Sequence, residues 1–436
     1  MQPMARAKRT FIVRLTDAVR GGGLALRRAA RFSDVGRRFG RVGPRAAPGA
    51  AALLAACCTF VCAATGQAQT PPPRDFVPKV KHVILMDGDT GGILFRHNAD
   101  ELLSPASMSK IMTVEIAFKL MKAGKLRPSD EFVMSVNAWR KGGAPSGTSA
   151  MMVPVHNKVR LDELLQGIIV QSGNDAAIAV AEGIAGNEDA FARLMNEEAR
   201  RIGLAQSQFR NATGLFHPEH VMTVREIGIL ARYIIREYPD YFPMFAQKEF
   251  LYRRHKFINR NSLLFADPNV DGMKTGNLKV SGYGMVVTSK VNGRRLIAVV
   301  AGAKSEAERR DEVRRLLDWG STSVSEFKLF EANEVVGRAR VWGGSAFYVR
   351  LVGNGDVNVW LPKFPAAQRL KGEIIYASPL KAPVKRGDEV ARLRVTSTSN
   401  AMQEVALYAA EDVDEGGIVR RGLDSLAHLA LRLIPR

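Results

Sequence analysis

Three short motifs, in order along the chain, combine residue types that could carry out acyl transfer. They are Ser107-Met108-Ser109-Lys110, then Ser172-Gly173-Asn174, then Lys274-Thr275-Gly276. A serine hydroxyl is a weak nucleophile and needs a base within hydrogen-bonding reach. Lys110 can act as that base if burial and a neighbouring positive charge, such as that of Lys274, lower its pKa. The sequence therefore predicts a serine nucleophile with a lysine base.

Each motif alone has a simpler explanation, either a solvated pair on a helix or an ordinary turn. A Ser-x-x-Lys or a Ser-x-Asn is expected by chance roughly once in a chain of 436 residues. Accidental copies are present at Ser325 with Lys328 and at Ser135 with Asn137. Lys-Thr-Gly occurs once, where on the order of 0.1 chance copies are expected. The order of the three motifs and their apolar helix and strand contexts favour a single catalytic site over three accidental matches.

The first motif is predicted to lie at the start of a buried helix. Ser104-Pro105 resembles an N-cap followed by proline at the first helical position, and the helix should run to about Met121, with Gly124 as its stop. Ser107 then falls in the first turn, where free backbone N–H groups and the positive helix end can hold an oxyanion.

The other two motifs should meet the first across a cleft. The second falls in an interhelical turn, where Gly173 lets the backbone bend and Ser172 and Asn174 project. The third falls at the start of a β region, where its glycine lets a substrate lie close to the strand. Lys274 and Thr275 would there face a carboxylate.

The periodicity of the chain predicts an α+β catalytic domain, with helices against a mostly antiparallel sheet. Strands are expected on either side of a turn at 82–96 and again at 284–300. Helices are expected at 162–186, 188–202, 224–238 and 309–320. Short alternating runs at 333–410 predict a small all-β domain.

The predicted divisions of the whole chain are a signal peptide with a long basic leading region at 1–68, a linker at 69–75, the catalytic domain at 76–331, the β-rich domain at 332–415 and an amphipathic helix at 416–436.

The first 68 residues differ from the rest of the chain. Twelve Lys/Arg and two Asp/Glu give them a net charge of +10, half of the chain's +20. An apolar run at 50–64 precedes Gly66-Gln67-Ala68, which suits cleavage by signal peptidase after Ala68. The alternative is a transmembrane anchor, but the run of about 15 residues is shorter than the roughly 20 that a span needs. We expect export, and the long basic region leaves a translation start downstream of Met1 open.

Composition narrows the classes of partner. All three cysteines, Cys57, Cys58 and Cys62, lie in the apolar run, so the processed chain would hold no disulfide and no Cys-bound metal. The strongest basic block lies in the removable segment, so nucleic acid is not an expected partner. His217 and His220 could be taken for metal ligands, but polar surface is the simpler reading, and no metal or cofactor is expected.

The C-terminal segment at 418–434 is predicted to form an amphipathic helix with a basic edge. Such a helix suits an anionic membrane interface. The alternative is a helix that packs on the β-rich domain. We expect a periplasmic protein attached peripherally to the outer face of the cytoplasmic membrane.

Three stretches carry a family resemblance: Pro105–Thr113, Gln171–Ala176 and Val270–Gly276. They are similar to those of the low-molecular-mass penicillin-binding proteins that act as D-alanyl-D-alanine carboxypeptidases. The resemblance extends from about Phe76 to Tyr408 and includes Leu316–Gly320. It implies a β-lactamase/transpeptidase-like catalytic domain, peptidoglycan stem peptides as substrate and β-lactams as covalent inhibitors.

The resemblance also implies a role for each residue at the site. Ser107 would be acylated, Lys110 would be its base, Ser172 would relay a proton to the leaving amine, and Asn174 would hold the substrate amide; Lys274, Thr275 and Gly276 would form the carboxylate-binding strand, the N–H groups of Ser107 and Asn277 the oxyanion hole, and Arg309 would assist carboxylate recognition. Because Arg310 is adjacent, the resemblance leaves open which of the two arginines matches the family's arginine. Many relatives have His where this chain has Asn277, which puts any imidazole contribution in doubt.

Two rival functions share parts of this pattern. A class A β-lactamase would add a glutamate that activates the deacylating water. No acidic residue occurs between Ala199 and Pro218, where that segment is expected. A wall-binding penicillin-binding protein without turnover would carry a damaged motif, and all three motifs are intact.

Overall fold

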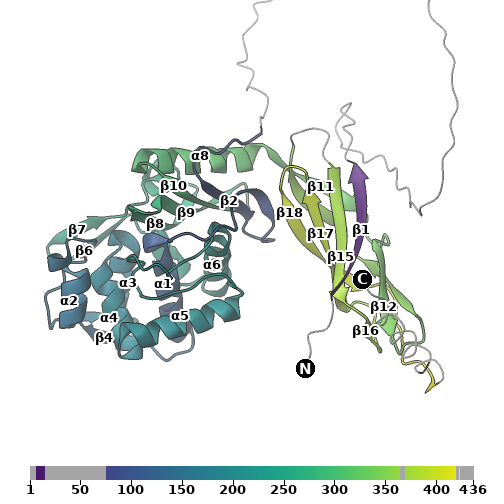
Figure 1. Ribbon diagram of the computed structural model, residues 1–436, viewed down its shortest axis with the longest axis horizontal. Coiled ribbons are helices and arrows are strands. Elements are labelled where there is room, and N and C mark those ends of the chain that lie inside the picture. Colours follow the sequence, from purple (N-terminus) through teal and green to yellow (C-terminus); the bar gives the residue numbers. More distant parts are fainter. Residues whose placement is uncertain (1–5, 15–74, 364–368, 419–421, 423–436) are drawn as a thin grey trace, which may run out of the picture.

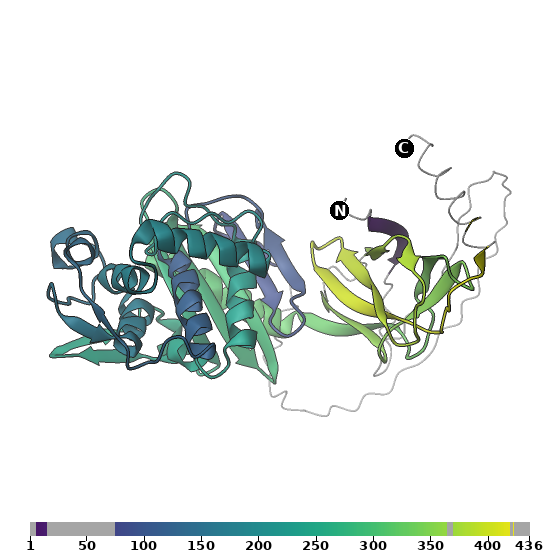
Figure 2. The ribbon, with the colours of Figure 1, turned by 90° about the horizontal axis from the view of Figure 1, so that it is seen from below.

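The computed structural model describes residues 6–14, 75–363, 369–418 and 422, and it has a helix-rich part and a β-rich part that lie side by side (Figure 1, Figure 2). A five-stranded antiparallel sheet forms the centre of the first part. In spatial order its strands are β3 (Ile93–His97), β2 (His82–Asp87), β10 (Arg294–Ala303), β9 (Gly282–Val291) and β8 (Val270–Leu278). The predicted α+β class is confirmed.

Helices cover both faces of this sheet, because the three middle strands, β2, β10 and β9, carry buried apolar residues on both sides. On one face, α8 (Glu306–Thr322) packs over β10 and β9. On the other face lie α1 (Lys110–Lys122), α2 (Val136–Gly142), α3 (Leu161–Gln166), α4 (Asn174–Ala185), α5 (Glu188–Ile202), α6 (Val224–Glu237) and the short turns η1 (Ala106–Ser109), η2 (Ala144–Ser146), η3 (Gly167–Gln171) and η4 (Phe242–Ala246). The short helix α7 (Leu263–Ala266) lies on the face of α8, because Leu263 and Leu264 share a core cluster with Val313 and Leu316. Two small antiparallel pairs complete this part: β4 (Glu131–Val133) pairs with β5 (Lys158–Arg160) across an intervening segment that contains α2, and β6 (Glu249–Tyr252) forms a hairpin with β7 (His255–Ile258).

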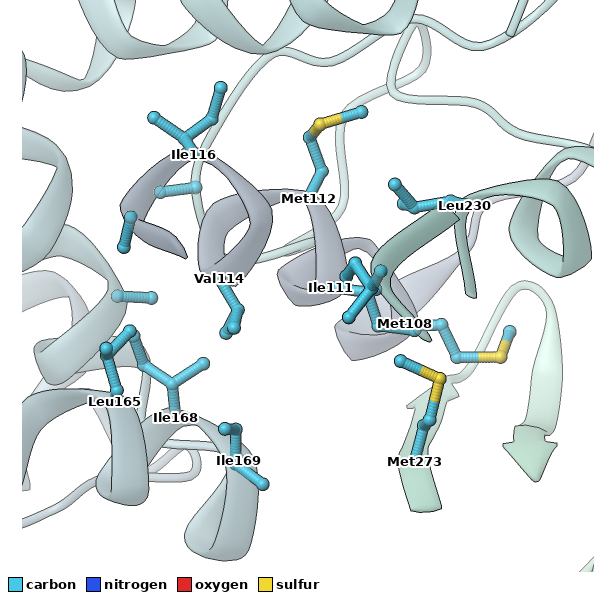
Figure 3. Packing of buried hydrophobic residues seen from close by; sticks show 14 of the residues in the cluster. Met108, Ile111, Met112, Val114, Ile116, Leu165, Ile168, Ile169, Leu230 and Met273 are labelled. Carbon is cyan, nitrogen blue, oxygen red and sulfur yellow. The ribbon is translucent and has the colours of Figure 1, made fainter. Parts of the chain in front are cut away.

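Helix α1 lies at the centre of the larger core, as its nearly uniform apolar sequence predicts. Figure 3 shows side chains of its first turns packed against α3, η3, α6 and β8; those labelled are Met108, Ile111, Met112, Val114, Ile116, Leu165, Ile168, Ile169, Leu230 and Met273. Packing at this density fixes the position of the residues at the N-terminal end of α1.

The predicted start of this helix is wrong. Ser104 does not cap it, and the chain forms the tight turn η1 before α1 begins at Lys110. Ala106 has φ 51, a left-handed conformation that an α-helix does not accept. Ser107 therefore lies in a 3-10 turn ahead of the α-helix. The stop at Gly124 is consistent with its φ of 67.

The β-rich part contains β11 (Val324–Phe330), β12 (Gly337–Trp342), β13 (Tyr348–Val352), β14 (Val357–Pro362), β15 (Arg369–Ala377), β16 (Leu380–Lys381), β17 (Glu389–Ser397) and β18 (Met402–Ala409). It begins earlier than the predicted boundary at 332, because β11 pairs with β14. It joins the central sheet where Met402 of β18 pairs with Ile93 of β3. The Arg294 guanidinium lies 4.1 Å from the centroid of the Trp360 ring at the same junction.

The two ends of the chain need separate mention. Strand β1 (Arg6–Arg14) pairs antiparallel with β15, although the sequence assigns this segment to a signal peptide. The apolar run, the cysteines, the cleavage site at Ala68 and nearly all of the predicted helix at 416–436 lie outside the described residues. Within the described residues, no helix has the length and apolar character needed to cross a membrane.

Candidate active site

Ser107 and Lys110 lie within hydrogen-bonding distance of each other at the junction of η1 and α1. The Lys110 Nζ atom is 3.0 Å from the Ser107 Oγ atom. It also donates to the Asn174 Oδ1 atom at 2.6 Å and to the Thr213 carbonyl oxygen at 2.5 Å. Three acceptors use all the donors of an ammonium group. Ser107 is half-buried, whereas Lys110 has 0% of its surface exposed.

The environment of Lys110 makes it a base near neutral pH. Its pKa is lowered to about 7, chiefly by burial and then by the positive charge of Arg260, while the carboxylate of Asp175 opposes the shift. Arg260, which our sequence analysis did not single out, supplies the neighbouring charge that we had assigned to Lys274. The pKa of Lys274 is itself lowered well below the usual value, by burial first and then by the positive charge of Lys110.

The second motif brings Asn174 into contact with Lys110 and buries Ser172 just before the start of α4. Ser172 adopts a left-handed conformation with φ 64 between η3 and α4, and it is 3% exposed. Our expectation that Gly173 provides the bend is therefore corrected: its φ is −54. A Cβ at Gly173 would lie 3.0 Å from the Asp175 Oδ1 atom and 3.2 Å from the Met151 backbone nitrogen. The glycine is needed for that close approach.

The residue after the second motif, Asp175, fixes a neighbouring loop. Its carboxylate accepts hydrogen bonds from the backbone N–H groups of Met151 at 2.7 Å and Ala176 at 2.9 Å. Asn174 joins the same loop, since its Nδ2 atom donates to the Thr148 Oγ1 atom at 2.9 Å and its backbone N–H to the Ser149 carbonyl oxygen at 2.7 Å. Both the side chain and the backbone of Asn174 are thus held by the loop, which fixes the oxygen that accepts from Lys110.

A loop that carries no recognisable motif, 211–215, completes the surroundings of Lys110. The Asn211 Oδ1 atom accepts from the N–H groups of Thr213 at 3.1 Å and Gly214 at 2.7 Å, which turns the Thr213 carbonyl toward Lys110. Gly214 has φ 75, and a Cβ there would overlap the carbonyl oxygen of Ala106. This loop therefore packs directly against η1 (Ala106–Ser109), the turn that carries Ser107 and is called the catalytic turn from here on.

The third motif lies on β8 beside the same turn. Lys274 and Thr275 are 3% and 6% exposed, and the Lys274 Nζ atom donates to the Thr275 carbonyl oxygen at 3.2 Å. Gly276 allows close approach to the protein itself: a Cβ there would lie 3.0 Å from the Pro105 carbonyl oxygen. We had expected the glycine to make room for substrate. Asn277 is exposed at the end of the strand.

Arg309 and Arg310 have different surroundings, and this difference bears on which of the two could assist carboxylate recognition. Arg309 is 4% exposed, its guanidinium lies 5.7 Å from the Tyr283 ring centroid, and its Nε atom has no hydrogen-bond partner among the described residues. Arg310 pairs with Asp311 at the surface. Arg309 and Arg260 both contribute to lowering the pKa of Lys274. The site thus concentrates positive charge and suits a substrate with a carboxylate.

The arrangement can carry out acyl transfer. It joins a hydroxyl, an adjacent amine that can lose its proton near neutral pH, and cations for a carboxylate. In the described part of the chain, no cluster of three or more His, Cys, Asp or Glu side chains could hold a metal ion.

Comparisons with known proteins give a consistent result. The family model described as D-alanyl-D-alanine carboxypeptidase matches residues 67–305, and the model of the C-terminal domain of penicillin-binding protein 5 matches residues 325–415. D-alanyl-D-alanine carboxypeptidase DacC of Escherichia coli strain K12 is 34% identical over 344 residues, 78% of this chain and 86% of that protein. DacF of Bacillus subtilis strain 168 is 29% identical over 83% of this chain and 92% of its own length. The crystal structure of penicillin binding protein 5 from Haemophilus influenzae matches with a TM-score of 0.64 and 31% identity, over 79% of this chain and 99% of that one.

Proposed function

This chain belongs to the D-alanyl-D-alanine carboxypeptidase family, and from that premise we propose that it removes the terminal D-alanine of peptidoglycan stem pentapeptides through an acyl-enzyme on Ser107. The observation that carries the proposal is the 3.0 Å contact between Ser107 Oγ and Lys110 Nζ, with Lys110 buried and its pKa lowered to about 7. That pair supplies a nucleophile and its base at neutral pH.

Acylation begins with neutral Lys110. Its amine takes the proton of the Ser107 hydroxyl while the Oγ atom attacks the carbonyl carbon between the last two D-alanines. The backbone N–H groups of Ser107 and Asn277 hold the oxyanion that develops. As the C–N bond breaks, the proton passes from Lys110 through the Ser172 hydroxyl to the leaving amine. Free D-alanine departs, Ser107 carries an ester, and Lys110 is neutral again.

Deacylation uses the same base on water. Lys110 takes a proton from a water molecule, whose oxygen attacks the ester carbonyl, and the proton returns to Ser107 Oγ as the ester breaks. The loop 211–215 presents the carbonyl oxygen of Thr213 to Lys110 and holds no carboxylate. This feature favours the carboxypeptidase over a β-lactamase of class A design, which uses a glutamate for the deacylating water.

Recognition of the substrate's terminal carboxylate falls to the third motif. Lys274 and Thr275 would hold the carboxylate, with Gly276 keeping β8 against the catalytic turn and Arg309 adding a buried charge. Asn174 would hold the amide of the substrate peptide.

The decisive experiment measures turnover and covalent capture together. The processed chain is expected to release D-alanine from a soluble pentapeptide and to gain one penicilloyl adduct on the peptide that contains Ser107 after exposure to benzylpenicillin. Ser107→Ala serves as the control without a nucleophile. An adduct without D-alanine release would support an inert binder, and the absence of any adduct would overturn the proposal.

The pH dependence of acylation should report the base. Because the pKa of Lys110 is lowered to about 7, acylation is expected to be slow below that pH and to rise as Lys110 loses its proton. Burial, and then the positive charges of Lys110, Arg260 and Arg309, also lower the pKa of Lys274. Loss of the Lys274 charge should raise KM on the alkaline side. A stopped-flow series with penicillin and a KM series with pentapeptide test the two limbs separately.

A matched pair of arginine variants tests carboxylate recognition. Arg309→Gln is expected to lower kcat/KM for a pentapeptide by roughly 10–100-fold, since a hydrogen bond to a charged group contributes about 1.5–3 kcal/mol. The exposed Arg310→Gln should behave as wild type. The ratio of rates for a free and an amidated C-terminus should fall in Arg309→Gln only. Equal effects of both variants would contradict the assignment of Arg309.

Localisation forms part of the same proposal. Export to the periplasm would follow from cleavage after Ala68, and peripheral attachment would follow from the amphipathic segment at 416–436. Deletion of 416–436 should move the protein from the membrane fraction to the soluble periplasmic fraction without loss of D-alanine release. Retention of the shortened protein at the membrane would contradict the assigned anchor.

A further inference from the structure

His220 is buried beside the catalytic turn, a place that its polar sequence surroundings did not indicate. It is 1% exposed, and its Nε2 atom lies 3.0 Å from the Oγ atom of Ser109. Ser109 lies between Ser107 and Lys110 in the first motif and is 0% exposed. The hydroxyl of the first motif that does not act as nucleophile thus has its own buried partner.

The hydrogen bonds of His220 define which ring nitrogen carries the proton. The backbone N–H of Arg210 points at the Nδ1 atom at 3.3 Å, and an N–H group can only donate. The Nδ1 atom is therefore the acceptor, and the Nε2 atom carries the hydrogen that it donates to Ser109. The ring joins the catalytic turn to the residue that precedes the loop 211–215.

Its surroundings keep the imidazole neutral. The pKa of His220 is lowered to about 4, chiefly by burial and then by the positive charges of His217, Lys110 and Arg210. The Phe209 ring packs edge-on against it at 5.6 Å between centroids, and Gln208 pairs with Val221 on the flanking backbone. A neutral, fixed donor is therefore present at the pH where Lys110 acts as base.

We infer that His220 is a positioning residue for the proposed acylation: by holding the Ser109 hydroxyl, it sets the geometry in which Lys110 reaches Ser107. The inference rests on the proposed role of Ser107. Among the described residues, the hydrogen bonds of His220 join it to Ser109 and Arg210, and its effect passes through two elements next to Lys110. One is the turn that carries Ser109, and the other is the loop that presents the Thr213 carbonyl oxygen.

Four variants of the processed chain test this role, with the rate constant for acylation by benzylpenicillin as readout. His220→Ala and Ser109→Ala are each expected to slow acylation by roughly 10–100-fold, because small displacements of a reacting pair have effects of this order. The double variant should be no slower than the slower single variant, since both changes break one contact. His220→Gln retains an N–H donor and an acceptor and should recover most of the rate. His217→Ala is the neighbouring control and should acylate as wild type.

Thermal melting of each variant separates positioning from folding. Wild-type acylation rates in folded His220→Ala, additive losses in the double variant, or a Gln variant as slow as the Ala variant would each overturn the inference. If His220→Ala does not fold, Ser109→Ala and His220→Gln still give the comparison. A wild-type chain that forms no adduct would overturn the proposed function and this inference with it, whereas failure of the variants alone leaves the function standing.

Discussion

Lys110→Arg is expected to slow acylation of Ser107 by ~10²–10⁴-fold, the range that a general base contributes, although it retains the positive charge. Arginine keeps its proton at every accessible pH, whereas burial and the Arg260 charge bring the pKa of Lys110 to about 7. A guanidinium can still donate to the Asn174 and Thr213 oxygens that Lys110 contacts. The variant therefore separates loss of the base from loss of the buried donor.

The measurement is the rate of labelling by fluorescent penicillin, alongside release of D-alanine from a pentapeptide. Lys119→Arg is a suitable control, because Lys119 lies on the same helix but forms a partly exposed ion pair with Glu198. The control should label at the wild-type rate. Labelling of Lys110→Arg at more than a tenth of the wild-type rate would mean that another group activates Ser107.

Local patterns in the sequence predicted the parts of the fold that local interactions decide. The helix expected at 188–202 has those bounds in α5, where Asn187 caps the first turn through the Ala190 N–H and Gly203 ends the helix with φ 92. The apolar run at 295–300 lies within β10, which is buried on both faces. Each of these signals is contained in a window of a few residues.

Contacts between distant segments decided what the sequence could not predict. Ala106 has a left-handed φ and packs against Gly214, more than a hundred residues away, and a local capping rule that takes no account of such contacts placed the helix start incorrectly. Arg260 influences Lys110 only because the chain after β7 returns to the catalytic turn. The three motifs were predictable because their residue types and order carry the chemistry. Arg260 and the loop 211–215 form no pattern of their own.

The close approach of Gly214 to the catalytic turn leads to the largest expected effect on stability. Gly214→Ala should lower the free energy of unfolding by at least about 3 kcal/mol, since left-handed strain of roughly 1–3 kcal/mol is joined by an overlap with backbone. The Cβ would meet the Ala106 carbonyl oxygen, an atom without a flexible side chain to move aside. Relief requires the loop and the turn to separate, which would draw the Thr213 carbonyl away from Lys110. Acylation of the folded fraction should therefore slow as well.

Gly186→Ala is the matched control for backbone strain. Gly186 has φ 82 at the end of α4, close to the φ of 75 at Gly214, but a Cβ there would meet no atom within 4 Å. Gly186→Ala should lower the free energy of unfolding by only about 1–2 kcal/mol and leave the rate of acylation unchanged. Urea unfolding of both variants isolates the contribution of the contact, because the backbone penalty is shared. Equal losses of stability in the two variants would mean that the left-handed conformation alone matters and that the loop does not hold the catalytic turn in place.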